Sequence, residues 1–377
     1  MEVGERIVGA QVVTIGRGGA VRDLPSADVD PDDVASLPVR TERWGDTTIE
    51  GVLAHSQARS LVVLHEGRLA YEWYGDGGDP DRRNRCYSVT KSFTGTLAST
   101  AMHEGLIDRT ATVGDLLPEL AASGFGDATV GDVADMTVSI GYDEDYADAG
   151  QAPSGEPTFG FGDYMLALGL ELPDAVVPGD APRTIRDLLA AVRPGRGPHG
   201  EVFMYATPCT DVLGWLLEQA RGMAYPDLLA EAIWSRIGAE HDARLSLDPA
   251  GTPTLGAGLA VTTRDLARFG LALGEITPVD VLDDIRDGGD REVFQRGGQY
   301  DYLSGYSYHD QWWLPGGPSR PLSAWGIHGQ VLWVDPDAGV VVATHCGGPD
   351  PSDQRRDVEQ DAMCRALTVA AAHWPTT

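Results

Sequence analysis

The chain has 377 residues, of which 57 are acidic and 28 basic, so its formal charge is -29 at pH 7. A field of this sign repels nucleic acid and anionic membranes, and we expect neither as a partner. With 42% hydrophobic residues and 9 Trp, 12 Tyr and 7 Phe, the composition is that of a folded, globular chain, and the length suggests one large domain or two interleaved ones.

The N-terminal sequence bears on the cellular location of the protein, and the cysteines bear on whether it has disulfides or a zinc site. Residues 1–6 hold neither a basic nor an apolar segment, and no later stretch approaches 18 uninterrupted apolar residues, so we expect a cytoplasmic protein. The cysteines lack CxxC spacing, which predicts reduced core thiols and argues against a zinc site or a disulfide scaffold. We expect no cofactor and no metal. The cysteines are Cys86, Cys209, Cys346 and Cys364.

The first third of the chain predicts an arm followed by a hairpin. Residues 1 to about 45 are acidic and contain prolines, which indicates an extended arm over the surface with little regular structure. Clear periodicity begins at residues 60–64 and returns at 69–74, on either side of a turn at 65–67. Two such runs around a short turn are typical of a β-hairpin.

Residues 88–105 predict a helix, because apolar residues recur at a spacing of four and Gly105 follows as a stop. Ser88 and Lys91 fall on one face of this helix within reach of each other. Lys91 is the single lysine among the 28 basic residues. Arginine keeps its proton, whereas a desolvated lysine becomes a neutral amine and a base. The pair therefore predicts a serine nucleophile with a lysine base, and a chance surface pair is the alternative.

From Gly105 to about residue 255 the pattern is helical and rich in loops. An acidic loop at 143–148 carries Tyr146, and a solvated surface loop is the plainer interpretation of it. Tyr205 precedes a helix opened by Thr210 and Asp211, where its phenol could pass a proton to a leaving atom; a buried core tyrosine is the alternative. Helical spacing is found at 113–120, 130–136, 164–170, 185–192, 212–221 and 225–237.

The last third of the chain returns to strands. After a capped helix at 263–273 and a long acidic connection, strand patterns come at 311–314, 331–334 and 340–345, and a final helix spans about 358–373. The segment Trp325-Gly326-Ile327-His328-Gly329-Gln330 enters the second of these strands, and its glycines permit close approach of the backbone to a ligand. A plain bend at a sheet edge explains it equally well.

Strands at both ends with helices between them predict an α+β fold with one antiparallel sheet, flanked by helices and carrying an all-helical insert. We expect residues 1–105 and 255–377 to form the α/β domain and residues 106–254 the mainly helical domain. The active site should lie between the two.

Three segments resemble the motifs of the serine β-lactamase and penicillin-recognising superfamily: Tyr-Ser-Val-Thr-Lys-Ser-Phe at 87–93, Tyr205-Ala206-Thr207, and Gly326-Ile327-His328-Gly329-Gln330. Within it the chain is similar, after about residue 50, to the class C-like 6-aminohexanoate-dimer hydrolases, the nylon-oligomer hydrolases, and to their esterase relatives. Residues 140–146 resemble the substrate-contacting segment of those hydrolases. The resemblance implies a β-lactamase/transpeptidase-like fold.

The resemblance also implies roles for individual residues. Ser88 would be the nucleophile, and Lys91 and Tyr205 the pair that relays protons. The backbone N–H groups of Ser88 and Ile327 would form the oxyanion hole, and Tyr146 would donate a hydrogen bond to the substrate amide. The other residues expected at the substrate are Trp325, Gly326 and His328.

The chain departs from the superfamily at two of these motifs. Ala324-Trp325-Gly326 stands where penicillin-recognising enzymes have Lys-Thr-Gly, and Thr207 stands in place of the usual Asn of Tyr-x-Asn. The lysine that would grip a β-lactam or a peptide carboxylate is therefore missing.

We accordingly expect a serine hydrolase (amidase and esterase, SxxK type) that forms an acyl-enzyme. It would cleave linear amides such as 6-aminohexanoate oligomers, as in nylon-oligomer degradation, and short carboxylic esters. The alternatives are a carboxylesterase or weak β-lactamase without an amidase role, and a penicillin-binding-like binding protein without turnover. The expected partner is a small-molecule amide or ester, and a homodimer is left open.

Overall fold

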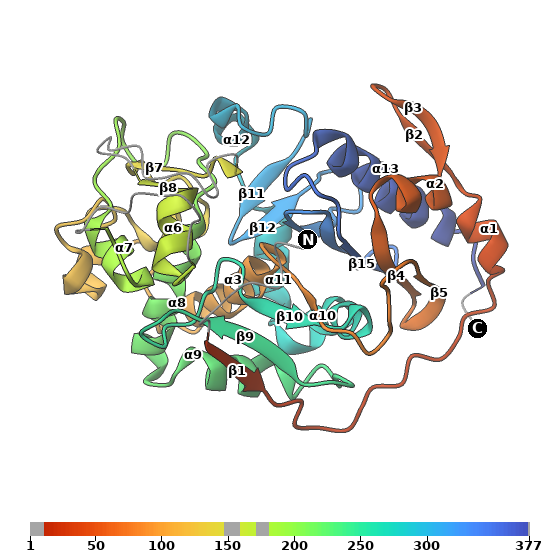
Figure 1. Ribbon diagram of the computed structural model, residues 1–377, viewed down its shortest axis with the longest axis horizontal. Coiled ribbons are helices and arrows are strands. Elements are labelled where there is room, and N and C mark those ends of the chain that lie inside the picture. The colour runs from red at the N-terminus through yellow and green to blue at the C-terminus, as the bar shows by residue number, and fades with distance from the viewer. Residues whose placement is uncertain (1–10, 147–158, 171–180, 376–377) are drawn as a thin grey trace.

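A seven-stranded antiparallel sheet lies at the centre of the computed structural model, which describes residues 11–146, 159–170 and 181–375 (Figure 1). Its strands come from both ends of the chain, as the sequence predicted. In spatial order they are β11 (Ser307–His309), β12 (Trp312–Leu314), β13 (Leu322–Gly326), β14 (Gln330–Asp335), β15 (Val340–Cys346), β4 (Ala58–His65) and β5 (Arg68–Tyr74).

The central strands are apolar on both faces because each face is covered. Along β4, Val62 and Leu64 belong to the core shared with α10 (Thr263–Ile276), whereas Leu61 and Val63 belong to the core shared with α13 (Gln354–Ala371). Figure 1 shows these two helices on opposite sides of the sheet. Side chains alternate between the faces of a strand, so a continuous apolar run feeds both cores.

The N-terminal segment is more regular than predicted. Within the described residues of this segment, the expectation of little regular structure is wrong at 11–15 and from 31 onward, whereas residues 16–30 contain no helix or strand. β1 (Gln11–Ile15) pairs with β9 (Ala243–Leu247), so this part of the segment is the edge of a second sheet. The remaining elements up to the hairpin, and the other two strands of that sheet, are α1 (Pro31–Ala35), β2 (Pro38–Thr41), β3 (Gly45–Thr48), α2 (Ile49–His55), β10 (Leu259–Val261) and β6 (Asn84–Arg85).

Helix α3 (Val89–His103) is the buried axis of the helical part and packs against α8 (Thr207–Arg221). The acidic connection after α10 holds two helices that the sequence analysis left as irregular, α11 (Val279–Asp287) and α12 (Arg291–Gly297). The other short elements are α4 (Val113–Leu116), η2 (Pro118–Leu120), α5 (Val130–Ala134), β7 (Tyr142–Asp143), β8 (Phe159–Gly160), α6 (Phe161–Ala167), α7 (Ile185–Ala191), α9 (Tyr225–Leu229) and η4 (Ala230–Trp234).

The division into domains at residues 105/106 and 254/255 stays a prediction. Strand β9 lies within residues 106–254 but shares a sheet with β1, β10 and β6, which lie outside that range. Within the described ranges, no helix combines the length and the apolar character needed to cross a bilayer. Of the acidic loop predicted at 143–148, residues 147 and 148 lie outside the described residues.

Candidate active site

Ser88 is the N-cap residue at the head of α3 and is 9% exposed. The preceding Tyr87 has a φ of 46°, in the left-handed region that residues other than glycine seldom adopt. Such backbone strain is kept only where the surroundings fix it, and it concentrates at functional sites. The turn thus fixes the Ser88 hydroxyl at the start of a buried helix.

Lys91 lies one turn further along α3 and is 1% exposed. Its Nζ donates hydrogen bonds to Ser88 Oγ at 2.9 Å, to Thr207 Oγ1 at 3.0 Å and to the Gly256 carbonyl oxygen at 2.8 Å. Burial lowers the pKa of Lys91 to about 8, although nearby carboxylates act in the opposite direction. The ammonium therefore loses its proton close to neutral pH, which a general base requires.

Tyr205 approaches Ser88 from the segment before α8 and is 3% exposed. Lys91 Nζ lies 5.0 Å from the centroid of its ring. Burial raises the pKa of Tyr205 above its ordinary value, and a hydrogen bond with Ser88 offsets this only in part. The phenol keeps its proton at neutral pH, so it can donate that proton to a leaving group.

Ser88 lies in the wall of a pocket of about 50 Å³ that Gly326 and Ile327 also line. Aromatic side chains supply most of the remaining wall, which suits an apolar acyl chain. These are Tyr146, Tyr205, Tyr300, Tyr302, Trp313 and Trp325.

The backbone N–H groups of Ser88 and Ile327 have no hydrogen-bond partner among the described residues, and both residues line this pocket. A Cβ on Gly326 would lie 2.5 Å from the Cys86 carbonyl oxygen. Only glycine therefore lets the end of β13 come this close to the turn that carries Ser88. The two donors are free to bind an oxygen of a ligand.

Tyr146 and Trp325, both predicted at the substrate, line the pocket. His328 does not line it. Its Nδ1–H donates to the Gly348 carbonyl oxygen at 2.8 Å, and its ring lies against Tyr87 with 5.2 Å between centroids. A substrate contact by His328 stays a prediction.

The beta-lactamase family model matches residues 45–363, which include the Ser88 turn, Tyr205 and the Gly326 segment. The chain belongs to the beta-lactamase family. The predicted α+β, β-lactamase/transpeptidase-like fold is thereby confirmed, and the chain is a hydrolase of this fold.

Known relatives agree with this assignment. A 6-aminohexanoate-dimer hydrolase of Paenarthrobacter ureafaciens is 32% identical over 342 residues, covering 87% of this chain and 83% of its own. A solved Bacillus anthracis structure, whose name of 6-aminohexanoate-dimer hydrolase is itself provisional, is 26% identical with a TM-score of 0.80, covering 97% of this chain and 91% of that one. A family VIII carboxylesterase at 18% identity and a TM-score of 0.56, covering 81% of this chain and 92% of that one, shares the fold.

A wider hollow of about 980 Å³ lies between residues 37–44 and α13 and shares Tyr302 and Leu303 with the Ser88 pocket. Neither Ser88 nor Lys91 lines it. In this beta-lactamase family member, the position of Ser88 therefore identifies the smaller pocket as the candidate active site, although the other hollow is larger.

Asp211 is a buried carboxylate near Lys91 that the sequence analysis named only as opening a helix with Thr210, whereas α8 begins at Thr207. It accepts hydrogen bonds from Tyr164 Oη at 2.8 Å and from the Leu255 N–H at 2.9 Å. It thus fixes the segment whose next residue, Gly256, accepts from Lys91. Burial raises the pKa of Asp211 to about 7.

Asp357 lines the pocket and was missed, because the sequence shows it only as one of several polar residues just before the helix predicted at about 358–373. Its carboxylate accepts from Tyr302 Oη at 3.1 Å and lies 3.4 Å from Arg356 Nη2. Burial raises the pKa of Asp357 to about 6, against the charge of Arg356. The carboxylate is ionised above this pH and gives the pocket a negative group.

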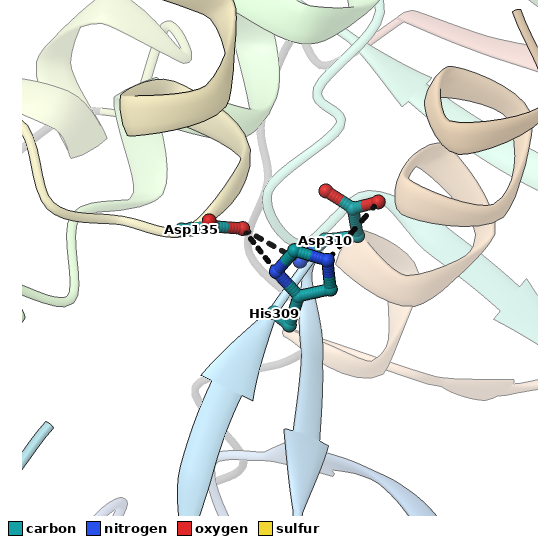
Figure 2. Close-up of side chains that lie close together, drawn as sticks. All are labelled: Asp135, His309 and Asp310. Carbon is teal, nitrogen blue, oxygen red and sulfur yellow. Dashed lines mark hydrogen bonds and ion pairs between the residues drawn. The ribbon is translucent and has the colours of Figure 1, made fainter. Parts of the chain in front are cut away.

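A second cluster of ligand-type side chains lies at the turn of the β11–β12 hairpin, where His309 is held between Asp135 and Asp310 (Figure 2). Arg109 Nη2 donates to both oxygens of Asp135 at 2.8 Å, and Arg109 Nη1 donates to Asp310. Burial lowers the pKa of His309, but the hydrogen bond and charge of Asp135, with Asp310, outweigh it and raise the pKa to about 9. Arg109 and His309 both pair with Asp135 and Asp310, so the cluster forms an ion-pair network in this structure.

Proposed function

We propose that the chain is a serine hydrolase that forms an acyl-enzyme on Ser88 and cleaves linear amides such as 6-aminohexanoate oligomers together with short carboxylic esters. The observation that carries this proposal is the buried amine of Lys91, 2.9 Å from Ser88 Oγ and with a pKa of about 8. A serine hydroxyl is a weak nucleophile until an adjacent base takes its proton.

In acylation, neutral Lys91 takes the proton of Ser88 Oγ while Oγ forms a bond to the carbonyl carbon, whose π electrons move to the oxygen. The tetrahedral intermediate then re-forms its carbonyl and breaks the bond to the leaving nitrogen or oxygen. That atom takes the phenol proton of Tyr205, and the proton held by Lys91 restores the phenol.

In deacylation, a water molecule loses a proton to the neutral amine and its oxygen adds to the acyl carbon. The bond to Ser88 Oγ breaks, and Oγ recovers the proton. In both steps the N–H groups of Ser88 and Ile327 would bind the oxygen that becomes negative. One such donor is typically worth about 3 kcal/mol of the barrier.

The substrate class rests on the relative's name and on two features of the pocket. The 6-aminohexanoate dimer is a linear amide with a cationic amino end. Asp357 offers that end a negative partner inside the pocket, and the phenol of Tyr146 is available to the amide. Burial raises the pKa of Tyr146 well above its ordinary value, so its proton remains available for donation.

A carboxylesterase without an amidase role is the second candidate, and the aromatic lining favours it because ester acyl chains need little more than apolar walls. Ala324 in place of the lysine of Lys-Thr-Gly disfavours the β-lactamase alternative. An inactive binding protein would be acylated and then release the acyl group slowly.

The test is a panel of p-nitrophenyl esters, nitrocefin and the 6-aminohexanoate dimer, with Ser88→Ala and Tyr146→Phe beside the parent. We expect cleavage of esters and dimer, loss of both in Ser88→Ala by about 1,000-fold or more, and a selective loss of dimer cleavage in Tyr146→Phe. Brisk ester turnover with no dimer cleavage and no effect of Tyr146→Phe would establish the esterase instead.

A further inference from the structure

Glu144 contacts Thr207, a hydrogen-bond partner of the proposed base Lys91, and has no role in the steps above. It is 3% exposed and comes from the same loop as Tyr146. Both of its oxygens are engaged by Thr207, the first residue of α8: Oε2 accepts from the Thr207 N–H at 2.8 Å and Oε1 accepts from its hydroxyl at 2.5 Å. The carboxylate thus satisfies a backbone donor that the start of a helix leaves unpaired.

The hydrogen bonds of Thr207 have a fixed direction. A carboxylate can only accept, so the one hydroxyl proton of Thr207 is committed to Glu144. The hydroxyl oxygen then faces Lys91 Nζ, 3.0 Å away, purely as an acceptor. The Gly256 carbonyl oxygen, 2.8 Å from the same Nζ, is also an acceptor only.

A neutral lysine amine has two N–H bonds and one lone pair. With its two hydrogens bound to Thr207 and Gly256, the lone pair is left to point at Ser88 Oγ, the third neighbour at 2.9 Å. We propose that Glu144, acting through Thr207, is a positioning residue that turns the lone pair of Lys91 toward the Ser88 proton. The inference rests on the function proposed above. It adds that hydrogen bonds within the protein fix the orientation of the Lys91 amine.

The charge of Glu144 has a second consequence for the base. Burial lowers the pKa of Lys91, and Glu144, followed by Asp211 and Cys209, raises it again. The Tyr205 ring also lies against the amine, and its phenol is neutral. Removing the negative charge of Glu144 removes an interaction that favours the ammonium. The pKa of Lys91 then falls, and the neutral base is present at lower pH.

The main test is the pH profile of kcat/KM for a p-nitrophenyl ester in the parent, in Glu144→Gln and in the control Asp145→Asn. The control removes one charge from the neighbouring, exposed position of the same loop. In Glu144→Gln the amide can donate to the Thr207 hydroxyl and turn its proton toward Lys91. We expect the plateau to fall by roughly 10- to 100-fold, within the range of general-base effects, while the acidic limb moves to lower pH. Asp145→Asn should change neither.

A second pair of variants keeps the test decisive if Glu144→Gln folds poorly. Thr207→Val removes the hydroxyl at nearly constant volume, and Thr207→Ser keeps it. We expect Thr207→Val to lose about 10-fold or more in the plateau and Thr207→Ser to stay within a few fold of the parent. Circular dichroism and thermal unfolding establish that each variant is folded.

Two results would overturn the inference. One is a Glu144→Gln profile with the parent's plateau and limb. The other is a lower plateau with an unmoved limb and equal losses in Thr207→Val and Thr207→Ser, because a mere anchor of the loop behaves in that way. Labelling the parent with a fluorophosphonate separates the two proposals. A parent unlabelled at Ser88 refutes the proposed function itself, whereas a labelled parent with an unmoved Glu144→Gln profile refutes only the role of Glu144.

Discussion

Lys91 differs from every other cation of this chain, because it is the one lysine and is buried beside a serine. Its pKa of about 8 places the change of protonation within the working range. The neutral amine is the base, so kcat/KM should rise with pH through an apparent pKa near 8. A pH–rate profile of the parent checks this, and an acidic limb centred below pH 6 would speak against Lys91 as the base.

Tyr205 should matter most when the leaving group is poor. An amide nitrogen leaves only after it takes a proton, whereas p-nitrophenolate leaves without one. Tyr205→Phe should therefore reduce kcat for the 6-aminohexanoate dimer by about 100-fold or more and that for the p-nitrophenyl ester by much less. Steady-state kinetics on both substrates give the comparison, and equal losses would assign Tyr205 a positioning role.

Asp357 should distinguish substrates by charge. Its carboxylate lines the pocket and is ionised above about pH 6. We expect Asp357→Asn to lower kcat/KM for the cationic dimer by roughly 10-fold, a typical worth of one charged contact, and to leave a neutral ester nearly unchanged. Parallel loss on both substrates would mean that the change disturbs the pocket as a whole.

At the scale of elements, α3 is tied to the β11–β12 turn by close contacts. Ser92 Oγ donates to the Gln311 carbonyl oxygen at 2.8 Å, and Ser99 Oγ donates to Asp310 Oδ2 at 2.7 Å. A Cβ on Gly95 would lie 2.1 Å from the Asp310 carbonyl oxygen, so a residue other than glycine at this position would force the helix and the turn apart. The sheet thereby holds the helix that carries Ser88.

The ion-pair network at this turn should make stability depend on pH. The pKa of His309 is raised from 6.5 to about 9 in the folded protein. Its contribution is therefore complete below pH 6.5 and lost as pH rises through about 9, and it amounts to on the order of 3 kcal/mol. Arg109, Asp135, Asp310 and, at 3.7 Å, Asp284 are the charged groups that face the ring.

His309→Gln should consequently destabilise the protein strongly at pH 6 and little at pH 10. Urea unfolding at the two pH values measures the difference, with His103→Gln on the exposed end of α3 as the control. A loss that is the same at both pH values would show that the charge of His309 contributes nothing.

At the scale of the whole molecule, the sequence predicted what local periodicity encodes. The β4–β5 hairpin, α3, α10 and the β14–β15 pair follow from apolar spacing over a few turns or strands. The pairing of β1 with β9 joins segments more than 200 residues apart, and nothing local marks it. The helices α11 and α12 were missed because each is short and buries only a few apolar residues among charged ones, so the apolar periodicity is weak.

The candidate site divides in the same way. Ser88 and Lys91 are neighbours on one helix, so their spacing predicts the contact. Asp143, Glu144 and Asp145 are alike in sequence, and only the fold shows that the middle carboxylate turns inward to Thr207 while the others are exposed. The contact of Glu144 with the first residue of α8 makes the difference, and it joins residues too far apart in the sequence for local spacing to predict it.

The central claim, that Lys91 activates Ser88 for acyl transfer, is tested most directly by timed mass spectrometry of the intact protein and its peptides during reaction with a p-nitrophenyl ester. We predict one acyl group per chain, on Ser88, formed at least about 100-fold more slowly in Lys91→Arg, which keeps the charge but cannot give up its proton. An acyl group on another residue, or an unchanged rate in Lys91→Arg, would contradict the account.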